Sequence, residues 1–178
     1  MENDDIINWS KDYFLNWSDF KAEVNSAAFE DSSSKIKFHH TWIVDSVMIN
    51  EKIYFVISNI QLTTQFLKHL SWVRLQNSSL ELLKHEQGHF DLAESLKQMF
   101  VEQIKIKFKD LKFPTRGQNE EQRKQFARED SGLMILQELE KCYKILDEES
   151  KKYCEETEFG NNLSKQKEFD EKFKKLRL

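Results

Sequence analysis

The chain has 178 residues, a third of them charged, with a net charge of −4 and a pI near 5.8. This length predicts a single domain, residues 1–178, with a substantial core. The acidic balance gives no electrostatic basis for binding nucleic acid, and no apolar run approaches the roughly 18 residues of a membrane span. One Pro and four Gly exclude a loop-rich or low-complexity protein.

Residues 1–5 are acidic and lack the basic and apolar segments of a signal peptide. We therefore expect a cytoplasmic protein as the chain stands, or an exported one if a signal has been removed. Cys142 and Cys154 lie twelve residues apart on one predicted helix. That separation is about 18 Å, too far for a disulfide, so both are expected to be free thiols. The sequence does not indicate which oligomeric state the protein has.

The strands are expected before the helices. Residues 24–34 predict a loop, and from residue 35 apolar and polar residues alternate, which predicts a strand with one buried face. The apolar run at 53–57 is typical of a more central strand. Residues 61–76 predict a short helix that includes Phe66 and Leu67, followed by an extended piece at 71–74.

Three histidines of this region are not expected at a metal site. His39 and His40 are adjacent on the predicted strand and point to opposite faces, so they cannot bind one ion together. A lone histidine on an apolar face, like His40, is more often a hydrogen-bonded core residue than a ligand. His69 is likewise not expected to be part of the metal site.

Two long helices and a short one follow. The first is predicted to begin after a capping box formed by Ser78 and Glu81 and to run to about Phe108. The second is expected at about 120–156, with a cap at Gly160 and an apolar stripe formed by Leu133, Leu136, Tyr143, Leu146 and Tyr153. The last contains Phe169, Phe173 and Leu176. Strands followed by helices predict an α+β fold.

The first long helix contains the motif His-Glu-x-x-His at residues 85–89. On a helix, His85 and His89 lie on one face, one turn apart, so both imidazoles can reach one zinc ion. Glu86 lies beside that face, close enough to hold a water bound to the metal. Five histidines and twenty glutamates give about 0.02 chance occurrences of the motif in a chain of this length. The flanking leucines and Phe90 predict a buried helix, and buried histidines need partners, which a metal supplies.

A catalytic zinc needs a third protein ligand. Glu94 is expected to point away from the two histidines, since it lies about 140° around the helix from His89. The end of the second long helix is the expected source, with Cys154, Glu156 and Glu158 as candidates. A solvated helix end is the simpler interpretation of any single acidic residue there. Tyr153, if close to zinc, could stabilise an oxyanion.

Four segments resemble a bacterial family of zinc-dependent proteases classed as domain of unknown function 922: residues 15–20, 71–74, 83–94 and 153–160, with Gln166 beyond them. The resemblance implies a zincin-like fold, in which a small N-terminal β-sheet packs on the long motif helix and the two further helices follow. It also implies a Zn²⁺ cofactor, a peptide or protein substrate, His85 and His89 as metal ligands, and Glu86 as the catalytic general base.

The chain departs from the family pattern at two positions. The family has Asp directly after the Tyr of its C-terminal motif and His two residues after the Thr, where this chain has Cys154 and Phe159. We carry two hypotheses forward. The first is a zinc metallopeptidase, a hydrolase of peptide bonds. The alternative is a degenerate, non-catalytic member of the family with a structural zinc or a protein-binding role.

Overall fold

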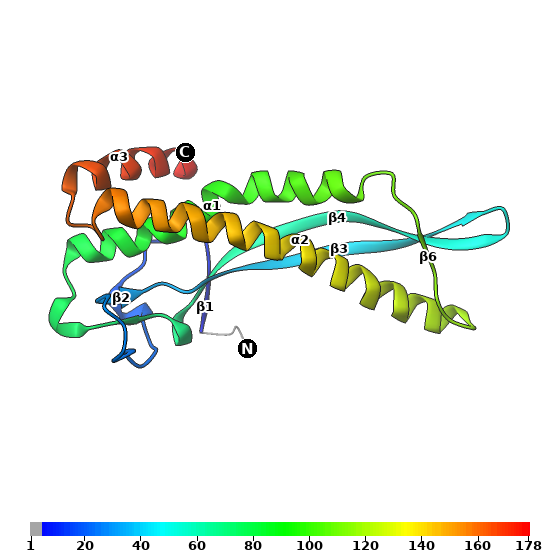
Figure 1. The fold of residues 1–178 in the computed structure, drawn as a ribbon, viewed down its shortest axis with the longest axis horizontal. Coiled ribbons are helices and arrows are strands. Elements are labelled where there is room, and N and C mark those ends of the chain that lie inside the picture. The colour runs from blue at the N-terminus through cyan, green and yellow to red at the C-terminus, as the bar shows by residue number, and fades with distance from the viewer. Residues whose placement is uncertain (1–4) are drawn as a thin grey trace. The chain divides into compact units, whose positions relative to one another are not determined.

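The computed structural model describes residues 5–178 and has an α+β fold with a small antiparallel sheet and three helices (Figure 1). Residues 1–4, part of the segment from which the absence of a signal peptide was predicted, lie outside this description. The chain divides into two compact units. The first unit comprises residues 5–39, 63–97 and 146–178, and the second comprises 40–62 and 98–145. The expected single domain stays a prediction.

The sheet is built around one long hairpin. Strand β3 (Ile36–Ile49) and strand β4 (Lys52–Leu67) are joined by Asn50 and Glu51, which both have positive φ, as in a type I′ turn. The short β1 (Ile6–Asn8) pairs antiparallel with the end of β4, and β6 (Phe113–Pro114) pairs antiparallel with its beginning. The alternation predicted from residue 35 is confirmed in β3, and the apolar run at 53–57 lies in the central strand β4.

The predicted short helix at Phe66 and Leu67 is wrong, because β4 extends through Leu67 and is followed by a 3₁₀ turn, Lys68–Leu70. Leu62, Thr64 and Phe66 are all buried with a period of two, which is the signature of a strand. The predicted loop at 24–34 also contains a strand, β2 (Ser32–Ser33). It pairs with β5 (Trp72–Val73), which lies in the predicted extended piece.

The helices lie close to their predicted positions: α1 (Leu80–Phe108), α2 (Glu120–Thr157) and α3 (Leu163–Lys174). Two details differ. The predicted capping box is wrong, because Ser79 Oγ, and not Ser78, accepts from the Leu82 amide. The predicted stripe of α2 is confirmed in part: Leu146 and Tyr153 are buried, but Leu133 and Leu136 are exposed, and Ile135 and Leu139 are buried in their place.

In the first unit, the start of α1 packs on the end of the sheet. Phe90 of α1, Phe66 of β4 and Ile7 of β1 belong to one apolar cluster with Leu15, Phe20 and Val73. Full burial of a phenylalanine side chain contributes about 2 kcal/mol, so Phe66 and Phe90 anchor this part of α1 strongly. A second cluster joins Leu92 of α1, Tyr153 of α2 and Phe173 of α3. The two clusters fix both sides of the motif helix.

In the second unit, Trp42 of β3 contacts α2. Its indole Nε1 donates to Ser131 Oγ at 2.9 Å, and the guanidinium of Arg128 lies over the indole, 3.7 Å from the ring centroid. Across residues 5–178, none of the helices combines the length and the apolar character needed to cross a membrane.

Candidate metal centre

The two histidines of the motif lie on one face of α1, as their spacing predicts. Their ring centroids are 4.9 Å apart, and His85 is only 2% exposed. Cys154 reaches them from the last turn of α2. Its Sγ lies 3.8 Å from His85 Nε2 and 3.5 Å from His89 Nε2. These three donor atoms lie within 4.8 Å of one another, and all three residues belong to the first unit.

The donor set fits a zinc ion. Tetrahedral zinc with Zn–S near 2.3 Å and Zn–N near 2.05 Å places a sulfur and a nitrogen ligand about 3.6 Å apart. The two observed sulfur–nitrogen distances lie on either side of that value. A thiolate combined with imidazoles is also a ligand set that suits zinc. Of the candidate third ligands, Cys154 joins the cluster, and Glu156 and Glu158 do not.

The protonation of the three donors follows from their surroundings. Burial lowers the pKa of His85 from 6.5 to about 4, with a further contribution from the neighbouring His89. Burial likewise lowers the pKa of His89 to about 4. Both imidazoles are therefore neutral near pH 7 and have a nitrogen lone pair to offer. Burial raises the pKa of Cys154 to about 11, and the negative charges of Glu86 and Glu30 add to the effect. Cys154 is therefore a thiol until a cation displaces its proton.

Glu86 lies next to the donor cluster without joining it. Its side chain is 3% exposed, and Oε1 accepts a hydrogen bond of 2.6 Å from Ser32 Oγ. Ser34 Oγ donates to Oε2. Ser32 belongs to β2, which pairs with β5, and Ser34 follows directly after that strand. The carboxylate is therefore held in a fixed orientation by the 31–34 segment.

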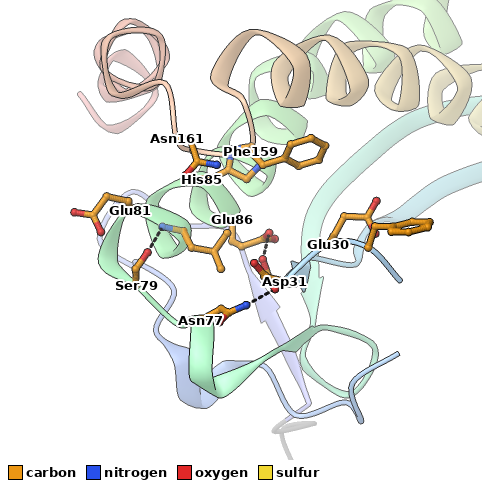
Figure 2. A pocket seen from close by; sticks show the side chains of 13 residues that line it. Glu30, Asp31, Asn77, Ser79, Glu81, His85, Glu86, Phe159 and Asn161 are labelled. Atoms are coloured by element: carbon orange, nitrogen blue, oxygen red, sulfur yellow. Dashed lines mark hydrogen bonds between the residues drawn. The ribbon is translucent and has the colours of Figure 1, made fainter. Parts of the chain in front are cut away.

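A pocket of about 340 Å³ opens beside His85 and Glu86. One wall is the segment 29–32, and another is the turn at 159–161 after α2 (Figure 2). Phe29 is fully exposed and Phe159 is 51% exposed, so both phenyl rings are accessible at the pocket. Cys154 and Phe159, the two positions at which the chain differs from the family that its sequence resembles, thus lie at the donor cluster and in the pocket wall respectively.

Tyr153 does not line this pocket. Its side chain is 1% exposed, its ring stacks on His85 at 4.7 Å, and its hydroxyl donates to the His85 carbonyl oxygen at 3.1 Å. Gln166 Nε2 of α3 donates to the same hydroxyl at 2.9 Å. The suggestion that Tyr153 stabilises an oxyanion is therefore wrong, because its hydroxyl is already bonded to His85 and Gln166.

The other sequence predictions for the site hold in part. His39, His40 and His69 lie outside the donor cluster. Glu94 accepts from Thr64 Oγ1 at 2.6 Å and pairs with Lys97, away from the motif histidines. Sequence reasoning missed Ser32, Ser34 and Thr157. The polar run at 31–34 signalled only a loop, and Thr157 entered only as part of the resembling segment 153–160, with no role assigned to it.

Comparison with family models, with curated proteins and with solved structures found no match. The residues of the site therefore carry the functional argument alone.

Proposed function

We propose that the protein is a zincin-like, zinc-dependent peptidase with His85, His89 and Cys154 as metal ligands. The observation that carries the proposal is the approach of Cys154 Sγ to both motif imidazoles, next to a pocket whose lining includes His85 and Glu86. Three protein donors beside an open pocket are the arrangement of a catalytic zinc site, whereas structural zinc sites have four protein ligands and are closed.

A bound zinc ion would polarise a peptide carbonyl and lower the pKa of a coordinated water to about 7. Glu86 is the general base in this proposal: its carboxylate takes the proton of the attacking water and passes it to the departing amine. A carboxylate has about four lone-pair positions, and Ser32 and Ser34 use two of them. The serines thus orient Glu86 and leave acceptor capacity for the water.

A non-catalytic zinc protein is the second candidate. The observation that favours it is the burial of Glu86, whose two oxygens already have serine partners. In that case Glu86 stabilises the contact between the 31–34 segment and α1, and the zinc ion ties α2 to α1.

One experiment with two arms tests both candidates. The first arm measures the zinc content and zinc affinity of wild type, Cys154→Ala and Cys142→Ala. Removal of a ligand should weaken zinc binding by more than about 100-fold, since even the loss of a residue that only supports a ligand costs 10- to 100-fold. Cys142→Ala is the matched control, because Cys142 lies outside the donor cluster, and it should bind zinc like wild type.

The second arm measures hydrolysis of a peptide library by wild type, Glu86→Gln and Glu140→Gln. Glu86→Gln should retain zinc and lose about 10²- to 10⁴-fold in rate, because an amide cannot accept the proton. Glu140 is exposed on α2, and its variant should be as active as wild type. Zinc binding without hydrolysis in wild type would favour the second candidate, and equal hydrolysis by Glu86→Gln would exclude Glu86 as the base.

A further inference from the structure

Thr157 lies directly behind His85. Its side chain is fully buried, and its Oγ1 is 3.2 Å from His85 Nδ1 and 2.7 Å from the Tyr153 carbonyl oxygen. A carbonyl oxygen cannot donate, so the short contact with Tyr153 uses the one proton of the threonine hydroxyl. Toward His85, Oγ1 can therefore only accept. The proton between these two residues belongs to the imidazole, on Nδ1.

We infer that Thr157 is a positioning residue that holds His85 in the Nδ1–H tautomer and so directs the lone pair of Nε2 to the metal. This inference rests on the proposed metal-binding function and goes beyond it, because it assigns a role to a residue that does not touch the ion. Nε2 is the nitrogen that faces Cys154 Sγ. In the other tautomer, Nε2 carries the proton and cannot bind a cation.

The end of α2 fixes the position of this hydroxyl. Thr157 is the last residue of α2, and its carbonyl oxygen accepts from the amides of Gly160 and Asn162 at 3.0 and 2.8 Å. Glu158, Phe159 and Gly160 all have positive φ, so the chain turns away sharply after Thr157. The tight turn leaves the hydroxyl at the end of the helix, facing His85 rather than solvent.

The Tyr153–Gln166 pair completes the support. The phenolic hydroxyl of Tyr153 has two acceptors at 3.1 Å, the His85 carbonyl oxygen and Gln166 Oε1, and its oxygen accepts an amide hydrogen of Gln166 at 2.9 Å. The second amide hydrogen of Gln166 is donated to Asp170 at 2.9 Å. Tyr153 thus contacts His85 at its ring face and its carbonyl oxygen, and Thr157 contacts it at Nδ1.

The first test needs no metal, and it reads the tautomer in the wild-type protein. Nitrogen-15 NMR of the imidazole rings in metal-free wild type distinguishes the protonated ring nitrogen from the unprotonated one. The His85 signals are identified by their loss in His85→Gln. We expect Nδ1–H with an unprotonated Nε2. An Nε2–H tautomer in wild type would overturn the inference, whatever the protein's activity.

The second test compares Thr157→Val, which has nearly the same shape without the hydroxyl, with Thr157→Ser, which keeps the hydroxyl. Zinc affinity is measured by competition with a chelator. Thr157→Val should bind zinc 10- to 100-fold more weakly, as found when residues that orient a ligand are removed. Thr157→Ser should bind within about threefold of wild type, since the acceptor is retained.

The outcomes separate this inference from the proposed function. Equal zinc affinity and an unchanged tautomer in Thr157→Val would overturn the role of Thr157 and leave the metal site intact. Zinc binding without hydrolysis in wild type would overturn the peptidase proposal and leave the role of Thr157 intact. Absence of zinc binding in wild type would overturn the metal site itself and, with it, the metal-directing role of Thr157.

Discussion

The residues of the donor cluster have opposite protonation preferences. Burial keeps His85 and His89 neutral and at the same time keeps Cys154 protonated. The imidazoles can accept a cation without losing a proton, whereas the thiol must release one. Zinc binding should therefore release about one proton per chain near pH 7, and acid should compete with the metal.

The lowered histidine pKa values predict how acid affects the metal-free protein. In the unfolded chain a histidine binds its proton near pH 6.5, and in the folded protein His85 and His89 do so near 4. Below pH 6.5 the unfolded state binds more protons, so the free energy of unfolding should fall as the pH falls toward 4. Each histidine contributes at most about 1.4 kcal/mol per pH unit.

Urea unfolding at pH 7, 6 and 5 in the presence of a chelator measures this dependence. His89→Asn should show a shallower loss of stability over the same pH range, and His39→Asn, outside the cluster, should behave like wild type. A stability that is constant or rises between pH 7 and 5 would contradict the burial of neutral imidazoles.

At the residue scale, the sequence was sufficient to predict which site residues lie together where their spacing on one helix decides the geometry. His85, Glu86 and His89 lie together because α1 is a helix, and the motif predicts that directly. For the third donor, the sequence indicates three candidate residues near the end of α2, and Cys154 is one of them. Ser32 and Ser34 contact Glu86 across more than fifty residues, so only the folded chain brings them together.

At the element scale, the motif helix depends on a close approach at Gly88. A Cβ added at Gly88 would lie 2.0 Å from the hydroxyl oxygen of Tyr153 and 2.6 Å from Cζ. Tyr153 can therefore pass over α1 and stack on His85 only because residue 88 lacks a side chain. This accounts for a glycine in the middle of a helix, where alanine would be better by about 1 kcal/mol in propensity alone.

Gly88→Ala should consequently destabilise the protein despite its higher helix propensity. The clash displaces Tyr153, and overpacking of this kind typically costs about 1–3 kcal/mol. Gly132→Ala on α2 is the matched control, because a Cβ there would meet Trp42 at an ordinary 3.4 Å. That variant should be neutral or stabilised by up to about 1 kcal/mol. Thermal unfolding of the two variants in parallel makes the comparison, and equal stability would exclude the close contact.

The long helices were predicted more accurately than the strands. Long helices were located to within about one residue of their ends, because their apolar spacing persists over many turns and Pro114 and Gly117 separate them. The end of β4 was mistaken for a helix, since Phe66, Leu67 and Leu70 also satisfy a helical spacing over a short segment. This segment forms a strand because Phe66 then packs against Phe90 and Phe20 in the core.

At the scale of the whole molecule, each of the two long helices has residues in both units. Helix α1 contributes residues 80–97 to the first unit and 98–108 to the second, and α2 contributes 146–157 and 120–145 respectively. The three residues of the donor cluster and the pocket residues all belong to the first unit. Composition and periodicity predict none of this division, because the apolar pattern of each helix continues across it.

Zinc should accordingly stabilise the two units to different extents. A ligand that binds only the folded state contributes about 2.7 kcal/mol at one hundred times its Kd. Any opening that separates Cys154 from His85 and His89 must first release the ion, whereas an opening confined to residues 98–145 leaves the donor set intact. Hydrogen exchange with and without zinc should therefore show added protection at 80–97 and 146–157, and little at 98–108 and 120–145. Cys154→Ala should show no gain in either unit. Equal gains along the full length of α1 and α2 would instead mean that the two units open together, because then the ion could resist every opening of the chain at once.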